Sequence, residues 1–106
     1  MDNNSIEMTG TVLFVDDENS ILNSIGRLFS DHSMKILKAD NAASALTHFE
    51  TESIAVIVTD NHMPGMKGTE LLARVRDISP DTVKILMTGH AELSVAIDAI
   101  NKGEVF

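Results

Sequence analysis

Short apolar segments rich in β-branched residues alternate with segments whose apolar residues recur at helical spacing, and this alternation is repeated four times. Such an alternation with short connections favours a parallel sheet with helices on both of its faces. The chain is therefore predicted to fold as a doubly wound α/β domain of three layers, α/β/α, with four βα units. The predicted strands are Thr11–Val15, Met34–Ala39, Ile54–Thr59 and Val83–Thr88, the fourth helix is Glu92–Lys102, and the third helix turns Leu71, Leu72, Val75 and Ile78 inward.

Composition agrees with one such domain and excludes several classes of function. The chain has 106 residues, of which 43% are apolar, so it can bury a core; polar residues 1–10 are expected to form a flexible lead-in to a domain over residues 11–106. The net charge of −8 argues against direct binding of nucleic acid or of an anionic membrane. The absence of cysteine excludes disulfides, thiolate zinc sites and thiol catalysis. Because no apolar run approaches the length of a membrane span, a cytoplasmic protein is expected.

Polar residues end three of the strand-like segments. Asp16 and Asp17 follow the first segment, Asp60 follows the third, and Thr88 ends the fourth. Parallel strands bring their carboxyl ends to one edge of the sheet, which is where open α/β sheets bind ligands. Any one of these aspartates has an alternative role as a helix cap or as the start of a turn. Their occurrence together at matching strand ends favours one shared site.

The chemistry of three clustered carboxylates indicates a divalent cation. Two carboxylates about 4 Å apart repel by about 1 kcal/mol in water and by about 4 kcal/mol at an effective dielectric constant near 20. A hard cation relieves that repulsion, and Mg²⁺ suits a site of few carboxylates, a backbone carbonyl, waters and a phosphoryl oxygen. A carboxylate can also accept a phosphoryl group as a nucleophile. The site is therefore predicted to support Mg²⁺-assisted phosphoryl transfer onto Asp60.

From Thr11 to Phe106 the sequence resembles the receiver domain of bacterial two-component response regulators. The resemblance rests on the acidic pair Asp16-Asp17, on residues 60–68 (DNHMPGMKG), which follow the family's D-x-x-M-P-x-M-x-G pattern, and on Thr88. It implies a flavodoxin-like (CheY-like) fold. It also implies a signalling module, not an enzyme, that receives a phosphoryl group from a sensor histidine kinase.

The resemblance further implies a role for each residue of the site. Asp60 is the phosphoacceptor, and Thr88 is the switch hydroxyl that follows the phosphoryl group. The ligands of Mg²⁺ are then Asp16, Asp17, Asp60 and a backbone carbonyl, that of His62 or of Asn61. In the family, the positions of His62 and His90 flank the site and tune the lifetime of the phosphoryl group. We interpret these two histidines as solvated loop residues in preference to zinc ligands.

Two alternative functions remain open from the sequence. A metal-dependent phosphatase would also use an aspartyl nucleophile, but haloacid-dehalogenase-type enzymes carry a second acid two residues later, where this chain has His62. A pseudo-receiver with a vestigial site would serve only dimerisation or docking. Turnover of phosphate esters would mark the phosphatase, and a defined oligomer without phosphorylation would mark the docking module.

The sequence departs from the family pattern after Gly103, because a fifth strand and a fifth helix are expected there and the sequence ends at Phe106. The fifth strand normally carries a lysine that contacts the phosphoryl group, and Lys102 does not take its place. One expectation is self-association through the open sheet edge or the fourth helix. The other is that the chain is a piece of a longer regulator. Its tail resembles receivers that continue into output domains, including HD-type phosphohydrolases.

Overall fold

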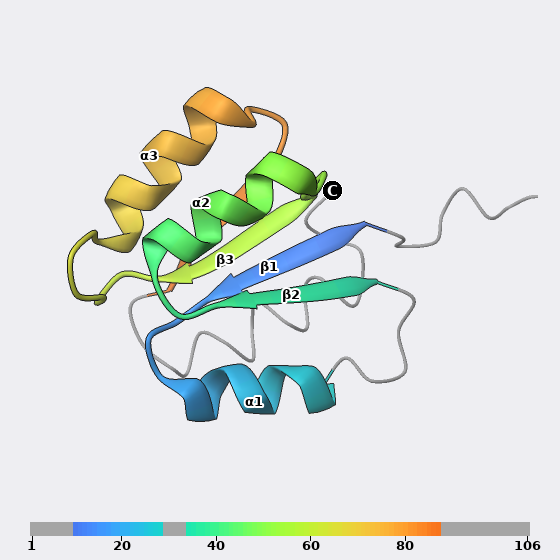
Figure 1. Ribbon diagram of the computed structural model, residues 1–106, viewed down its shortest axis with the longest axis vertical. Coiled ribbons are helices and arrows are strands. Elements are labelled where there is room, and N and C mark those ends of the chain that lie inside the picture. Colours follow the sequence, from blue (N-terminus) through green and yellow to red (C-terminus); the bar gives the residue numbers. More distant parts are fainter. Residues whose placement is uncertain (1–9, 29–33, 88–106) are drawn as a thin grey trace, which may run out of the picture.

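The computed structural model describes residues 10–28 and 34–87, without the side chains of residues 26–28, and shows in these ranges a four-stranded sheet and three helices (Figure 1). The strands are β1 (Thr11–Val15), β2 (Lys35–Ala39), β3 (Val56–Asp60) and β4 (Val83–Met87). The helices are α1 (Asn19–Leu28), α2 (Ala42–Thr51) and α3 (Gly68–Ile78). The strand order is β2-β1-β3-β4 and every pair is parallel. This is the flavodoxin-like order, and it confirms the predicted fold class.

The first predicted strand, Thr11–Val15, matches β1, and the bounds of the second and third predicted strands differ from the observed bounds by one or two residues. The third strand begins at Val56 and not at Ile54, although Ile54 is itself buried. Three parts of the prediction lie outside the described residues. They are the lead-in up to residue 9, the last residue of the fourth strand (Thr88) and the fourth helix (Glu92–Lys102). Within the described ranges, no helix has the length and apolarity needed to cross a membrane.

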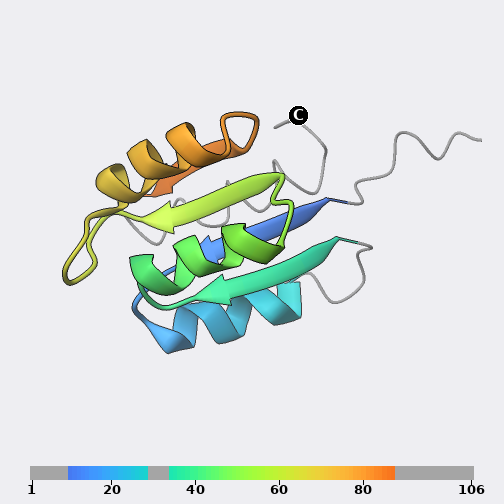
Figure 2. The ribbon, with the colours of Figure 1, turned by 45° about the horizontal axis from the view of Figure 1, so that its top comes forward.

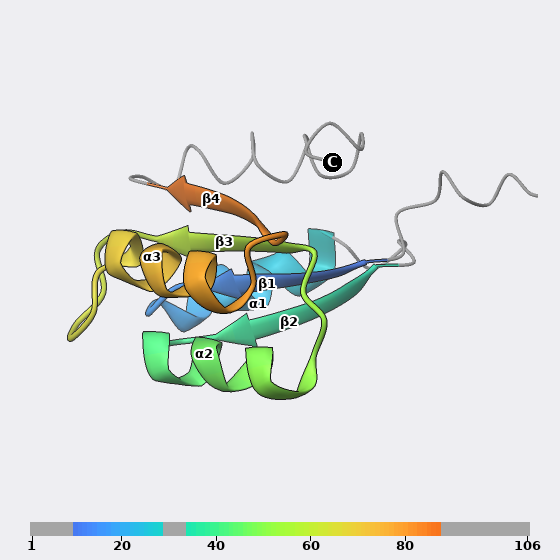
Figure 3. The ribbon, with the colours of Figure 1, turned by 90° about the horizontal axis from the view of Figure 1, so that it is seen from above.

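The sheet separates two apolar cores, because successive side chains of a strand point to opposite faces. Helix α1 covers one face, and α2 and α3 cover the other (Figures 1 and 3). The core on the α1 side contains Val12, Phe14, Leu22, Ile25, Met34, Val56, Val58 and Met87. The core on the opposite side contains Leu13, Val15, Ala39, Ala42, Ala45, Ile54, Ile57, Met63, Leu71 and Val75. Burial on both faces explains why β1 and β3 are almost uninterrupted apolar runs.

The two helices on the same face begin with different capping contacts. In α2 the Oδ1 atom of Asn41 accepts a hydrogen bond from Ser44 N at 2.7 Å, which satisfies one of the free backbone donors of the first turn. In α3 the Oε1 atom of Glu70 accepts one from Lys67 N at 3.0 Å. The start of each helix is therefore fixed by a side chain that accepts a backbone N–H.

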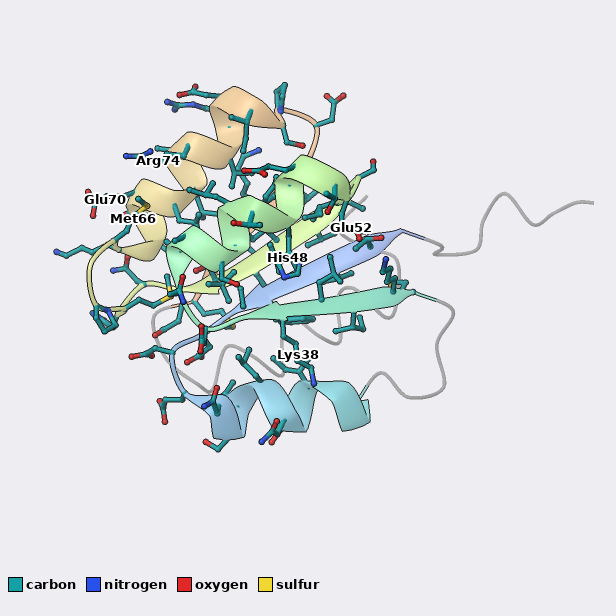
Figure 4. All side chains as sticks on the ribbon, viewed as in Figure 1. Lys38, His48, Glu52, Met66, Glu70 and Arg74 are labelled. Carbon is teal, nitrogen blue, oxygen red and sulfur yellow. The ribbon has the colours of Figure 1, made fainter. Side chains whose placement is uncertain are left out.

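Polar contacts link α2 and the residue that follows it to the edge strand β2. Lys35 Nζ donates to Glu52 Oε1 at 3.0 Å, and His48 Nε2 lies 3.2 Å from the Lys38 carbonyl oxygen. Figure 4 shows the Lys38 side chain on the side of the sheet that α1 covers, whereas His48 lies on the side of α2. Charged residues along an edge strand oppose pairing with another chain. This edge of the sheet is therefore protected.

The predicted inward position of Ile78 is wrong. Leu71 and Val75 of α3 are fully buried, but Ile78 is 57% exposed. Ile78 is the last residue of α3 and borders a groove of about 530 Å³, which Leu46 and Phe49 of α2 also line. Because α3 ends here, its last turn borders this groove and not the sheet.

Candidate functional site

The carboxyl ends of β1 and β3 bring the predicted acidic residues together. Val15 pairs with Thr59 in the parallel register, so Asp16 and Asp60 follow at the same level of neighbouring strands. Asp17 comes next, in the turn that leads to α1. Figure 2 shows the strands pointing the same way, so that their carboxyl ends form one edge of the sheet. The topology thus gathers three carboxylates that are distant in sequence.

The geometry of these carboxylates fits a single divalent cation. Asp16, Asp17 and Asp60 each offer an oxygen, and these oxygens lie within 4.8 Å of one another. Asp16 is 1% exposed and Asp60 is 8% exposed, whereas Asp17 is open to solvent. Repulsion between the two buried carboxylates is screened least by water. Several carboxylate oxygens at one point are the ligand set that Mg²⁺ or Ca²⁺ prefers.

Asp16 has a structural contact in addition to its place in the cluster. Its backbone N–H donates to the Ala39 carbonyl oxygen of β2 at 3.1 Å, and its Oδ1 accepts a hydrogen bond from Glu18 N at 2.9 Å. The second contact shapes the turn that precedes α1. Asp16 therefore combines two roles, because it shapes the start of a helix, as the alternative from the sequence has it, and also belongs to the acidic cluster.

The loop after Asp60 folds back onto the end of β3. Gly65 has φ of +86°, and Met66 N donates to the Pro64 carbonyl oxygen at 3.1 Å, which makes a tight three-residue turn. Gly68 then begins α3 where there is no room for a side chain. A Cβ atom on Gly68 would lie against the Asp60 carbonyl oxygen and 3.0 Å from Asn61 Cα. The first turn of α3 therefore packs directly on the backbone of Asp60 and Asn61.

Asn61 makes contacts that the sequence analysis missed. Its backbone N–H donates to the Met87 carbonyl oxygen of β4 at 3.0 Å, and its own carbonyl oxygen accepts from Gly68 N at 3.2 Å. Its Oδ1 accepts from Thr69 N at 3.3 Å. No local pattern signals this side-chain contact, because the partners are eight residues apart. The neighbouring His62 is exposed.

Other residues of the predicted site lie outside the described part of the chain. These are the switch hydroxyl of Thr88, the flanking His90 and the region around Lys102. The predicted self-association through the fourth helix falls in the same region. Their roles stay predictions.

Comparison with known proteins shows the family. The response regulator receiver domain matches residues 12–105. The hydrogenase transcriptional regulatory protein HoxA of Bradyrhizobium diazoefficiens is 30% identical over 95% of this chain and 21% of its own length. The transcriptional regulatory protein FixJ of Rhizobium meliloti is 30% identical over 90% of this chain and 47% of its own length. The solved signal receiver domain of an HD domain-containing protein from Pseudomonas fluorescens Pf-5 has a TM-score of 0.74 and 31% identity, covering 93% of this chain and 79% of that chain.

The chain thus spans between about a fifth and about half of the length of these two curated relatives. The family match confirms the resemblance inferred from residues 60–68 and the acidic pair. It favours a signalling module over both the aspartyl phosphatase and the docking-only alternative. This chain belongs to the family of response regulator receiver domains, the signalling modules of two-component systems.

Proposed function

We propose that Asp60 accepts a phosphoryl group from the phosphohistidine of a sensor histidine kinase. The observation that carries this proposal is the grouping of Asp60 with Asp16 and Asp17, whose oxygens lie within 4.8 Å of one another. In the transfer, a carboxylate oxygen of Asp60 forms a bond to phosphorus while the bond between phosphorus and the histidine nitrogen breaks. The imidazole keeps the electron pair of the broken bond. The products are an aspartyl phosphate and an unmodified kinase histidine.

Mg²⁺ is the cofactor that this site fits. Its protein ligands are Asp16, Asp17, Asp60 and the carbonyl oxygen of His62. We prefer His62 to Asn61 for the carbonyl ligand, because the Asn61 carbonyl oxygen already accepts a hydrogen bond from Gly68 N at 3.2 Å. When bound, the ion supplies positive charge that offsets the charge of the transferring phosphoryl group.

Thr88 is proposed to carry the signal away from the site. Asp60 pairs with Met87 in the register of β3 and β4, and Thr88 is the next residue of the chain. This pairing supports a hydroxyl placed to donate to a phosphoryl oxygen on Asp60. Added charge at Asp60 would then bias the segment after β4 between two arrangements. The change in that segment is the output signal.

The output itself is proposed to reside in another part of the regulator or in a separate protein. The solved relative from Pseudomonas fluorescens is the receiver of an HD domain-containing protein, which supports an HD-type phosphohydrolase as one output. HoxA and FixJ are transcriptional regulators, so DNA binding elsewhere in the regulator is the other candidate. The net charge of −8 argues against direct contact between this domain and DNA. A sensor kinase that phosphorylates this domain places it in the cytoplasm.

Intact-mass spectrometry after incubation with an acyl phosphate such as acetyl phosphate tests the proposal. We expect one phosphoryl adduct that requires Mg²⁺ and is absent from Asp60→Asn. Asp40→Asn is a matched control, because Asp40 is an exposed aspartate directly after β2 at the same edge of the sheet. This control should form the adduct as the wild type does.

Three results would contradict the proposal. An adduct that persists in Asp60→Asn would move the phosphoacceptor to another residue. No adduct on a chain that circular dichroism shows to be folded would reduce the domain to a docking role. Release of inorganic phosphate from phosphate esters at a steady rate would restore the phosphatase alternative.

A further inference from the structure

Asn61 joins three structural elements at the acidic site. It directly follows Asp60, the last residue of β3. Its backbone N–H donates a hydrogen bond to the Met87 carbonyl oxygen of β4, and its own carbonyl oxygen accepts one from the N–H of Gly68, the first residue of α3. Its side-chain oxygen reaches Thr69 N at 3.3 Å, so both its main chain and its side chain are tied to the first turn of α3. Movement of α3 relative to β3 would therefore displace the peptide that follows Asp60.

The side-chain contact of Asn61 does more than satisfy a free N–H in the first turn of α3. The Lys67 N–H, at the N-cap of that helix, has a separate acceptor in Glu70 Oε1. Asn41, in contrast, caps α2 locally, with its Oδ1 2.7 Å from Ser44 N three residues later. The Asn61 contact spans eight residues and closes the whole loop that carries His62. It therefore reinforces the closure of this loop, to which the backbone hydrogen bond from Gly68 N to the Asn61 carbonyl oxygen also contributes.

We propose that Asn61 is a positioning residue for the cation site: its amide oxygen, through Thr69 N, holds the end of β3 against α3 and so keeps the Asp60 carboxylate and the His62 carbonyl at a fixed spacing. This inference rests on the proposed function, because it assumes that these groups bind Mg²⁺. The close contact of Gly68 with the backbone of Asp60 and Asn61 leaves the loop little freedom while the side-chain bond is present. Without that side-chain hydrogen bond, the backbone hydrogen bond from Gly68 N to the Asn61 carbonyl oxygen still joins the end of β3 to the first residue of α3.

The test is the Mg²⁺ affinity of the folded protein, measured by titrating Mg²⁺ alone and following backbone amide signals by NMR. Removing an outer contact of a metal ligand commonly weakens affinity by about 10- to 100-fold. Because Asn61 acts through the loop, we expect about a 10-fold loss for Asn61→Ala. Asn41→Ala is the matched control, since it deletes the same side chain from a helix start at the same edge. It should lower Tm by about 5 °C and leave the Mg²⁺ affinity unchanged.

A second variant removes the same hydrogen bond from its other side. Thr69→Pro deletes the donor N–H at a first-turn position where proline is tolerated, and it leaves Asn61 intact. We expect the same loss of Mg²⁺ affinity as for Asn61→Ala, with no further loss in the double variant. This variant also keeps the inference testable if Asn61→Ala does not fold.

The outcomes separate this inference from the proposed function. Wild-type Mg²⁺ affinity in Asn61→Ala or in Thr69→Pro, with only Tm lowered as in Asn41→Ala, would overturn the positioning role and leave the proposed function intact. If the wild-type protein binds no Mg²⁺, both the proposed function and this inference are overturned. The same holds if Asp60→Asn binds Mg²⁺ as tightly as the wild type.

Discussion

The two ends of the sheet satisfy their polar groups in opposite ways. At the carboxyl end, Asp16 and Asp60 are buried within a cluster of three carboxylates. At the amino end, the buried Thr82 donates from Oγ1 to the Ile54 carbonyl oxygen at 2.6 Å and lies 2.7 Å from Ser79 Oγ. The buried polar group at the amino end thus makes neutral hydrogen bonds, which join the residue before β4 to the segment before β3 and to the end of α3. The carboxyl end concentrates like charge.

This difference separates stability from function along one sheet. Neutral, satisfied hydrogen bonds at the amino end stabilise the fold without any ligand. Like charges at the carboxyl end oppose folding, and a bound cation would offset their repulsion. Substitutions at the amino end should therefore change stability alone. Substitutions of the residues that form or directly support the acidic cluster should change stability and Mg²⁺ binding together.

The largest effect is expected for Gly68→Ala, at the carboxyl end. The new methyl group would press on the Asp60 carbonyl oxygen and on Asn61 Cα, so the backbone must shift. Overpacking of this kind costs about 3 kcal/mol, which outweighs the gain of about 1 kcal/mol that alanine usually brings to a helix. Chemical denaturation should show the lower free energy of unfolding, and Mg²⁺ affinity should fall as well. A variant as stable as the wild type would mean that the contact is looser than the structure indicates.

Thr82→Val tests the amino end, with an expected cost of about 1.5 kcal/mol in the free energy of unfolding. The valine keeps the shape of threonine but leaves the Ile54 carbonyl oxygen and Ser79 Oγ without this partner. The same denaturation experiment measures the cost. Formation of the phosphoryl adduct and Mg²⁺ affinity should be unchanged in the folded variant. A large change in either would show that the two ends of the sheet are coupled.

Gly65→Ala probes the loop at the carboxyl end where space is available. An alanine Cβ at this position has open space around it, but φ of +86° is unfavourable for any residue with a side chain. The expected cost is about 1 kcal/mol, from backbone strain alone. Thermal unfolding should detect it as a fall in Tm of about 5 °C. A loss as large as that of Gly68→Ala would contradict the distinction between strain and steric contact.

The smallest effect is expected for Lys35→Met, at the amino end of β2. Its ion pair with Glu52, 3.0 Å long, lies at the surface, with the lysine side chain 57% exposed. Such pairs contribute about 0.5 kcal/mol or less, and salt screens them. Denaturation at low and high salt should give nearly equal free energies of unfolding for variant and wild type. A loss above about 1 kcal/mol would show that the pair holds α2 in place.

Much of the fold was predictable, because buried parallel strands leave uninterrupted apolar runs in the sequence. The register then explains the acidic cluster: once β1 and β3 are neighbours, residues that end both strands must meet. The grouping of Asp16, Asp17 and Asp60 therefore follows from the strand pattern of the sequence. Ile78 was not placed correctly, because helical spacing does not reveal where a helix passes beyond the layer that covers it.

The contacts of Asn61 and Gly68 show why the rest of the site could not be predicted. The hydrogen bond from Thr69 N to Asn61 Oδ1 depends on a loop that brings the chain back to the end of β3. Gly68 begins α3. Its close approach to Asp60 follows from tertiary packing, for which the sequence carries no local pattern. Residues that support a site from outside are less visible in sequence than the charged groups they position.

The most direct test is the free energy of unfolding of the wild type and of Asp60→Asn, each measured with and without Mg²⁺. Without Mg²⁺ the variant should be more stable by about 1 to 4 kcal/mol, because one buried like charge is removed. Mg²⁺ should stabilise the wild type, by about 2.7 kcal/mol at 100 times its dissociation constant, and should stabilise the variant much less. A variant that is less stable than the wild type, and that Mg²⁺ stabilises equally, would contradict a charge-loaded cation site at the carboxyl end of the sheet.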